Sequence, residues 1–314
     1  GFEAVAAEAI RLPRGPLQAL VFPFKFLSCI LQNRRQLKKF HVNVALCMGS
    51  FASVPMGLAT RLLKIPLCLH EGNAILGQAN RLQSRWAKVL GLTYPLLDNY
   101  KTKAPQVHTG MPIRQPLLDE AKKQSERSEL CKELSLNEEL PILFVFGGSQ
   151  GARAINDAIK KLINEQAEIF KTMQLILFTG QDDNADWLKF IDVHGIKAVI
   201  KARDPEIHKF YTVCDFIICR SGASTLAELA VFSKAPLMIP YPAAKYDHQT
   251  ANAQTVVNAD SGWLLKEAEL SSESLAKQLN DWLKNGNNKN ANHQSIARDD
   301  AAEKMVDLLK QYAV

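Results

Sequence analysis

The chain has 314 residues, of which 47% are hydrophobic and 22% charged, and it carries a net charge of +6. This length favours two domains over a single core, and the composition is typical of a folded globular protein and not of a disordered chain. No apolar run reaches the roughly 20 residues that cross a bilayer. The six cysteines are dispersed without a C-x-x-C pair, which argues against a disulfide framework or a zinc site.

The positive charge is concentrated in the first part of the chain. Residues 1–112 contain 14 Lys and Arg against 4 Asp and Glu, whereas the remainder contains 24 against 28. A basic region of this kind indicates an anionic partner. Because the sequence has no nucleic-acid-binding motif and no interleaved aromatic platform, we expect no nucleic acid as a partner and favour an anionic membrane surface.

An apolar segment at residues 16–31 lies within this basic region. Leu20, Phe24, Leu27 and Leu31 repeat at helical spacing, and a basic cluster follows at 34–39. One interpretation is a helix that lies in a membrane interface, with its basic end at the lipid headgroups. The other is a core helix with a solvated basic end. The residues alone leave both open.

Strand-like runs alternate with helix-like segments along the whole chain. In the first half, strands are predicted at 42–48, 66–70, 89–92 and 106–109, with a helix at 55–63. In the second half, strands are predicted at 142–146, 174–179, 197–200, 215–219, 236–239 and 263–265, and helices near 150–165, 205–213, 224–233, 247–258 and 299–312. This alternation predicts an α/β fold with two doubly wound, parallel-sheet domains. The predicted boundaries are 1–118, a charged connection at 119–140, a second domain at 141–298 and a final helix at 299–314.

Two strand-to-helix turns in the second domain have the pattern of phosphate sites. The first follows the strand at 142–146 and contains Gly147, Gly148, Ser149 and Gly151. Such a turn directs backbone N–H groups and the positive end of a helix at an anion. It is neither a Walker A loop, which ends in Gly-Lys-Ser/Thr, nor a G-x-G-x-x-G fingerprint.

The second turn follows the strand at 215–219. Ser224 or Thr225 is predicted to cap its helix, and Glu228 follows one turn later. A carboxylate there either stabilises the helix dipole or accepts hydrogen bonds from a ribose diol. The next strand ends before Asp247-His248-Gln249 and Asn252, which adds polar groups at the same edge. Two phosphate turns with a carboxylate indicate a nucleoside diphosphate.

A third polar cluster follows the short strand at 66–70 in the first domain. His70, Glu71 and Asn73 lie within four residues. A lone histidine in this position is more often a core residue. Because Glu71 and Asn73 lie next to it in the sequence, a functional site is an equal alternative. No spacing of His, Cys or carboxylate residues is typical of a metal site, so no metal is expected.

Several motifs together resemble the MurG family of bacterial glycosyltransferases, in order and spacing, over essentially the whole chain. They are Met48–Pro55, His70–Asn73, Gly110–Arg114, Gly147–Ala152, Cys219–Glu228, and His248-Gln249 with Asn252. The resemblance implies a GT-B fold with the active site in a cleft between two domains, and metal-independent, inverting transfer without a cofactor. The implied substrates are UDP-GlcNAc as donor and the muramoyl O4 of undecaprenyl-pyrophosphoryl-MurNAc-pentapeptide (lipid I) as acceptor, giving lipid II.

The resemblance also implies roles for individual residues and domains. Asn73 would contact the donor sugar, and Arg114 and Ser149 the donor nucleotide. The diphosphate and ribose would be held by Ala223, Ser224, Thr225 and Glu228, with Gln249 as a further donor contact. Residues 1–118 would bind acceptor and membrane, 141–298 would bind the donor, and 299–314 would return to the first domain. The implied location is the cytoplasmic face of the bacterial inner membrane, as a peripheral protein.

One family motif has no counterpart in this sequence. The family opens with a strand and a glycine-rich G-G-T-G-G-H loop that contributes to the acceptor site and contains a histidine proposed as the base. We therefore expect an intact donor half but impaired acceptor binding and catalysis in this polypeptide, with His70 and Glu71 as the remaining candidates for the catalytic base. The alternatives are another GT-B transferase that uses a UDP-sugar with a different lipid acceptor, or a non-catalytic UDP-sugar-binding protein.

Overall fold

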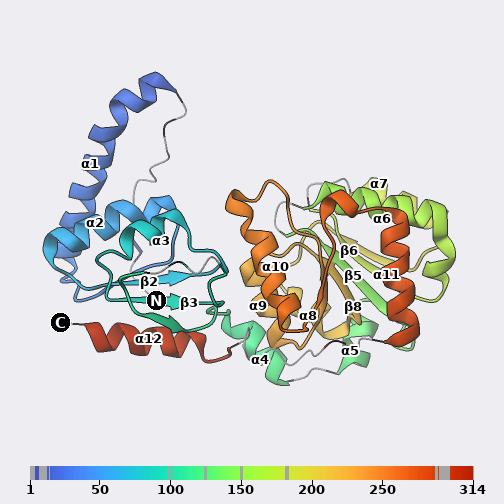
Figure 1. Cartoon of the computed structure of the whole chain (residues 1–314). Helices are drawn as coiled ribbons and strands as arrows, with labels where there is room; N and C mark the ends of the chain where they lie inside the picture. The colour runs from blue at the N-terminus through green and yellow to red at the C-terminus, as the bar shows by residue number, and fades with distance from the viewer. Residues whose placement is uncertain are drawn as a thin grey trace. The chain divides into compact units, whose positions relative to one another are not determined.

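The computed structural model describes residues 4–6, 13, 15–97, 100, 102–123, 126–148, 151–180, 184–286, 289 and 298–313. The chain divides into two compact units (Figure 1). Unit 1 comprises Gly1–Met111 and Asp300–Val314, and unit 2 comprises Pro112–Asp299. Each unit contains a parallel sheet flanked by helices, so the predicted α/β class with two parallel sheets is confirmed.

Unit 1 is built on four parallel strands in the order β1-β2-β3-β4. The strands are β1 (Ala45–Cys47), β2 (Leu67–Glu71), β3 (Val89–Leu92) and β4 (Gln106–His108). The helical elements are α1 (Pro16–Lys39), η1 (Phe51–Ser53), α2 (Val54–Leu63), α3 (Gln78–Gln83) and α12 (Ala301–Tyr312). Every residue of β2 and β3 is buried, which explains why β3 and the first three residues of β2 are apolar. His70 and Glu71, at the end of β2, are buried polar residues.

The C-terminal helix α12 belongs to unit 1 although it follows unit 2 in the chain. Met305 of α12 is 3% exposed. Its terminal methyl group would lie 2.5 Å from a Cβ added at Gly91 of β3. Glycine at this position therefore lets the helix approach the sheet closely.

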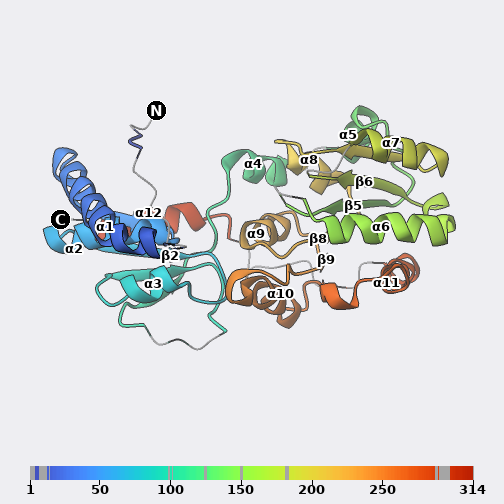
Figure 2. The same ribbon diagram turned by 90° about the horizontal axis from the view of Figure 1, so that it is seen from above.

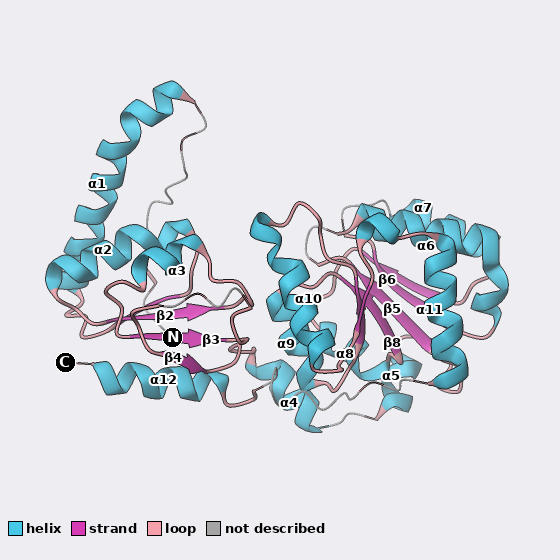
Figure 3. Cartoon of the chain, viewed as in Figure 1, coloured by secondary structure: helices cyan, strands magenta, loops and turns pink. Residues whose placement is uncertain are grey.

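Unit 2 contains six parallel strands in the order β10-β9-β8-β5-β6-β7. They are β5 (Ile142–Phe146), β6 (Gln174–Phe178), β7 (Ala198–Lys201), β8 (Phe216–Cys219), β9 (Pro236–Met238) and β10 (Trp263–Leu264). Three of them, β6, β5 and β8, are labelled side by side in Figure 3. The helical elements are α4 (Gln115–Lys123), α5 (Arg127–Glu133), α6 (Arg153–Gln166), η2 (Ala167–Lys171), α7 (Asn184–Val193), α8 (Ile207–Val213), α9 (Ala223–Val231), η3 (Lys245–Asp247), α10 (His248–Asn258), η4 (Glu267–Glu269) and α11 (Ser272–Asn285). The segment 119–140, expected to be a charged connection, contains the end of α4 and all of α5.

Helices cover both faces of the unit 2 sheet (Figure 2). Leu143 and Val145 of β5 pack with α6 and α11 in one core, whereas Phe144 and Phe146 pack with α5 and α8 in the other. The alternation of side chains along a strand sends successive residues to opposite cores. Because both cores are apolar, β5 is apolar throughout. Polar residues that could bind a ligand are therefore expected at the ends of the strands.

The strand order reverses at β5, where a ligand site is expected. The chain runs outward from β5 to β6 and β7, then returns to place β8 on the other side of β5. Phe146 at the end of β5 pairs with Cys219 at the end of β8, and Cys219 pairs with Met238 of β9. The turns after these three strands therefore leave the same edge side by side. Ligands of open α/β sheets bind at such a reversal, outside the carboxyl ends of the strands.

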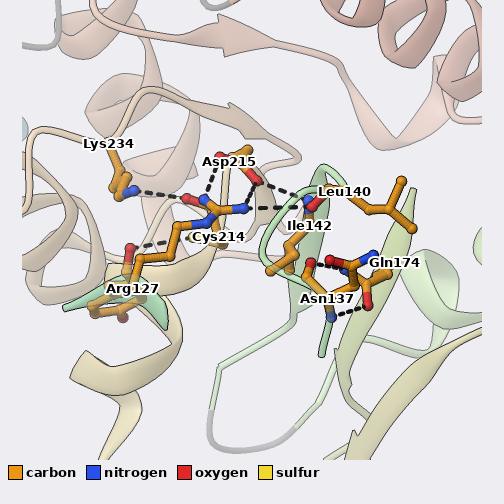
Figure 4. Close-up of polar contacts among 9 residues, drawn as sticks. Arg127, Asn137, Leu140, Ile142, Gln174, Cys214, Asp215 and Lys234 are labelled. Atoms are coloured by element: carbon orange, nitrogen blue, oxygen red, sulfur yellow. Dashed lines mark hydrogen bonds and ion pairs between the residues drawn. The ribbon is translucent and has the colours of Figure 1, made fainter. Parts of the chain in front are cut away.

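An ion pair lies at the other end of the strands, where β5 and β8 begin (Figure 4). Arg127 of α5 donates to both carboxylate oxygens of Asp215, at 2.6 and 2.7 Å, and the backbone N–H of Ile142 donates to the same carboxylate at 2.9 Å. The Asp215 carboxylate thus joins a helix to the starts of β5 and β8, far from the edge where a ligand is expected.

We expect Asp215→Ala to lower the free energy of unfolding by about 3 kcal/mol, because the Arg127 guanidinium and the Ile142 N–H both lose their acceptor. Urea unfolding followed by circular dichroism measures this. Glu168→Ala is the control, since it removes an exposed pair with Lys171, and we expect little change there. Equal effects of the two substitutions would contradict this role for Asp215.

Candidate functional site

The turn between β5 and α6 brings the backbone to an open surface. A Cβ at Gly147 would lie 2.3 Å from the backbone nitrogen of Ala152 and 2.6 Å from the carbonyl carbon of Gly151, so only glycine fits. Gly148 and Gly151 have φ of +82° and +75°, the left-handed region that glycine adopts without strain. A Cβ at Gly148 would meet no atom within 4 Å. Ser149, predicted to contact the donor, lies outside the described residues.

Helix α6 begins directly after this turn without a side-chain cap. Its N-cap residue is Ala152, and its first turn contains no acidic residue. The N–H groups of the first turn have no intrahelical acceptor, and the helix dipole adds positive potential. The start of this helix is therefore suited to an anion such as a phosphate.

Helix α9 begins in the same way at the end of β8. Its N-cap is Gly222, again without a side-chain cap. The prediction that Ser224 or Thr225 caps this helix is therefore wrong: both lie inside its first turn, where Ala223 and Thr225 are half-buried and Ser224 is exposed. This position leaves the Ser224 hydroxyl at the surface beside the backbone N–H groups.

Glu228 lies in the next turn of α9, partly exposed and contacted from two sides. Its side chain is 17% exposed, so it faces neither bulk solvent nor a closed apolar core. The Tyr211 hydroxyl donates to Oε2 at 3.2 Å, and Nη2 of Arg114 lies 3.9 Å from Oε1. Burial raises the pKa of Glu228, an effect that the Tyr211 hydrogen bond and the Arg114 charge oppose.

The segment after β9 is joined to the start of α9 by hydrogen bonds through Ser221. The buried Ser221 hydroxyl donates to the backbone carbonyl of Gln249, and the Asn252 amide donates to the carbonyl of Ser221. The Gln249 side-chain oxygen accepts from the backbone N–H of Tyr241. The turn after β8 and the segment after β9 are thereby fixed to one another.

Arg220 is a residue of this edge to which the sequence analysis assigned no role. It is 9% exposed. Its guanidinium donates to the carbonyls of Ile239 and Pro240 at 3.0 and 3.1 Å, and it pairs with Glu267 at 2.5 Å. The signal available in the sequence was its place between a buried strand and a glycine turn. Its bonds indicate that it positions the segment after β9.

In unit 1, the Glu71 carboxylate organises its own loop. It accepts hydrogen bonds from the backbone N–H groups of Asn73 and Gly77 at 3.1 and 2.9 Å, and from the side-chain amides of Asn73 and Asn80 at 3.1 and 2.9 Å. Glu71 is 5% exposed. A buried carboxylate with four donors holds the loop in place and has no free position from which to accept a substrate proton.

His70 is also buried and already bonded. It is 1% exposed, and its Nε2 lies 2.9 Å from the carbonyl oxygen of Gly110. Burial lowers the pKa of His70, which keeps the ring neutral. The geometry therefore supports a structural role for His70 and Glu71 and does not support the hypothesis that either is the catalytic base. Of the three residues His70, Glu71 and Asn73, only Asn73 lies in the loop between β2 and α3, where it is hydrogen-bonded to Glu71.

The His70 environment predicts a pH effect on stability. Because the folded state lowers its pKa below the ordinary 6.5, the unfolded chain binds a proton there that the folded chain excludes. The contribution of neutral His70 to the free energy of unfolding is fully present above pH 6.5 and is lost as the pH falls below this value. We expect the unfolding free energy to fall more steeply from pH 7.5 to 5 in the wild type than in His70→Gln. Parallel pH profiles in urea titrations would contradict this.

The structure thus groups the predicted residues into two sets. Unit 2 brings together Arg114, Ala223, Ser224, Thr225, Glu228 and Gln249, and unit 1 holds His70, Glu71 and Asn73. Among the described residues, no three His, Cys, Asp or Glu side chains gather as metal ligands would. Across the described part of the chain, no helix has the length and hydropathy that crossing a membrane requires.

Comparison with known proteins shows the family to which the chain belongs. Models of the glycosyltransferase family 28 C-terminal and N-terminal domains match residues 142–312 and 2–91. A UDP-N-acetylglucosamine–N-acetylmuramyl-(pentapeptide) pyrophosphoryl-undecaprenol N-acetylglucosamine transferase of Geotalea uraniireducens is 32% identical over 308 residues, 97% of this chain and 82% of its own. The chain belongs to this family. It is a glycosyltransferase of family 28, and the resemblance to the MurG family is confirmed.

Two further proteins extend the comparison. The transferase of the same name from Protochlamydia amoebophila is 35% identical over 263 residues, 83% of this chain and 68% of that protein. The crystal structure of Acinetobacter baumannii MurG matches with a TM-score of 0.74 at 24% identity, covering 98% of this chain and 84% of that one. This structure supports the fold.

Proposed function

We propose that the chain transfers GlcNAc from UDP-GlcNAc to the muramoyl O4 of undecaprenyl-pyrophosphoryl-MurNAc-pentapeptide, which yields lipid II, with inversion at the anomeric carbon. The family relatives are named for a reaction of this donor with this class of acceptor. The observation that carries the proposal lies at the carboxyl edge of the unit 2 sheet. There, two helices without side-chain caps, α6 and α9, follow neighbouring strands, and the half-buried Glu228 carboxylate lies in α9.

The donor occupies this edge in the proposal. The diphosphate lies at the starts of α6 and α9, where backbone N–H groups and helix dipoles compensate its charge. Glu228 accepts hydrogen bonds from the ribose diol, and Gln249 makes a further contact with the donor. As the glycosidic bond to UDP breaks, negative charge grows on the leaving diphosphate. Fixed N–H groups and the Arg114 guanidinium stabilise this charge without any reorganisation of solvent.

The acceptor hydroxyl must lose a proton as it attacks the anomeric carbon. His70 is neutral and bonded to Gly110, and the Glu71 oxygens are occupied by the loop that they hold. We propose that both residues act indirectly, by fixing the loop that carries Asn73. Loss of the Glu71 carboxylate would then raise the KM for UDP-GlcNAc through Asn73.

A membrane-docking role is proposed for one face of α1. Leu20, Phe24, Leu27 and Leu31 are 72%, 74%, 55% and 43% exposed. The opposite side of the helix packs on α2 through Ile30 and Leu37, which are buried. The periodicity seen in the sequence therefore belongs to an exposed stripe, and the core-helix interpretation is wrong for these four residues.

The basic residues that follow on α1 complete this surface. Arg34, Arg35, Lys38 and Lys39 are exposed in the last two turns of the helix. An apolar stripe of this kind enters the acyl boundary of a bilayer, while the basic end contacts anionic headgroups. This surface of α1 would hold the enzyme at the membrane, where a polyprenyl-linked acceptor resides.

Transfer assays with radiolabelled UDP-GlcNAc test the proposed reaction. We expect label in a lipid-linked disaccharide when lipid I is the acceptor, and none with diacylglycerol or sterol acceptors. Transfer to one of the latter would favour a GT-B enzyme of different acceptor specificity. Binding of UDP-GlcNAc without transfer to any of these acceptors, even after the family's glycine-rich loop is joined to the N-terminus, would favour a non-catalytic binding protein.

A further inference from the structure

Tyr211 is a completely buried tyrosine whose only described side-chain hydrogen bond reaches the candidate site. It lies on α8 and is 0% exposed. Its ring packs against Phe144 and Phe146 of β5, at centroid distances of 6.1 and 6.0 Å, and against Phe232 after α9, at 5.4 Å. These aromatic contacts fix the ring, and so fix the direction in which its hydroxyl points.

That hydroxyl donates to Oε2 of Glu228 at 3.2 Å. Burial and the neighbouring Glu228 charge raise the pKa of Tyr211 far above its ordinary value, so the phenol stays protonated and remains a donor. Arg114 lies beside the other oxygen, Oε1, at 3.9 Å. The carboxylate is therefore held by a hydrogen bond at Oε2 and faces a cation at Oε1, and part of its side chain remains accessible.

We propose that Tyr211 is a positioning residue for the donor: its hydroxyl orients the Glu228 carboxylate so that the remaining lone pairs accept both hydroxyls of the ribose. This inference rests on the proposed donor site. A carboxylate oxygen accepts more than one hydrogen bond, so the Tyr211 bond leaves room for the diol. A carboxylate free to rotate would have to be ordered when the nucleotide binds, which would weaken binding.

Tyr211→Phe tests the proposal because it removes the hydroxyl and preserves the ring packing. We expect the KM for UDP-GlcNAc to rise about tenfold, the effect of one hydrogen bond to a charged group, while kcat stays within about twofold. The preference for UDP-GlcNAc over its 2′-deoxyribose analogue, measured as a ratio of kcat/KM values, should fall by a similar factor.

Three further variants separate this role from a general effect on folding. Tyr94→Phe removes the hydroxyl of another fully buried tyrosine, in unit 1, and should leave the ribose preference unchanged. Glu228→Ala, which removes every acceptor at this position, should abolish that preference. In the Glu228→Ala background, Tyr211→Phe should have no further effect on KM, because its route to the nucleotide is gone.

The outcomes separate the role of Tyr211 from the assignment of Glu228 to the ribose. If Glu228→Ala abolishes the ribose preference and Tyr211→Phe leaves it intact, Tyr211 is a structural residue and the donor site stands. If Glu228→Ala itself leaves the preference intact, the assignment of Glu228 to the ribose fails, and the role of Tyr211 fails with it. Should Tyr211→Phe lower thermal stability, direct titrations with UDP and with 2′-deoxy-UDP at a temperature where the variant is folded still measure the ribose preference.

Discussion

Gly147→Ala should reduce kcat/KM for UDP-GlcNAc by at least about 100-fold, or about 3 kcal/mol of binding and transition-state stabilisation. The added Cβ would lie 2.3 Å from the Ala152 nitrogen and 2.6 Å from the Gly151 carbonyl carbon. These are backbone atoms that cannot rotate away. The turn has to open, which displaces the first N–H groups of α6 from the diphosphate. Steady-state kinetics and titration with UDP both measure the loss.

Gly195→Ala is the matched control in the same unit. Gly195 has φ +62°, and a Cβ there would meet no atom within 4 Å. The variant should lose about 1 kcal/mol of stability from the left-handed backbone and keep the donor KM of the wild type. Wild-type donor affinity in Gly147→Ala would show that the β5–α6 turn does not hold the diphosphate.

Replacing two residues of the exposed α1 stripe should release the protein from membranes. The double substitution Leu20→Glu with Phe24→Glu removes two apolar side chains from the acyl boundary and adds charges that anionic lipids repel. Each side chain contributes about 1.5–3 kcal/mol when buried, so vesicle binding should fall about 100-fold or more. Sedimentation with vesicles that contain anionic phospholipid measures the partition coefficient.

A matched double substitution on α7 controls for the added charge. Leu188 and Val193 are 52% and 82% exposed, and replacing both with Glu should leave vesicle binding unchanged. Binding of the wild type should also weaken with salt, because Arg34, Arg35, Lys38 and Lys39 contribute through screened electrostatics. Equal vesicle binding by the two double variants would contradict docking through α1.

Much of the donor unit could be predicted because local signals and tertiary structure agree there. Five consecutive apolar residues at 142–146 followed by glycines predicted a buried strand and a tight turn, and β5 ends at Phe146 as expected. Helix α11 was missed although Leu275 and Leu279 are spaced for one face and Ser271 forms a capping box with Ser274. The apolar spacing and the two serines are both present in the sequence.

Other features depend on contacts that no local pattern contains. The spacing of the apolar residues in α1 defines a face, but not whether another element covers it. The Glu71 carboxylate looked available in the sequence, and only the fold brings the Asn80 amide onto it. Likewise, the bond from Tyr211 to Glu228 spans 17 residues and two helices, so neither residue predicts the other.

The central claim is that a UDP-sugar binds at the carboxyl edge of the unit 2 sheet. A crystal structure with UDP-GlcNAc tests it most directly. We predict diphosphate oxygens within hydrogen-bond distance of the first backbone N–H groups of α6 and α9, and both ribose hydroxyls on the Glu228 carboxylate. A nucleotide bound at another edge of the sheet, or a ribose that makes no contact with Glu228, would contradict the account.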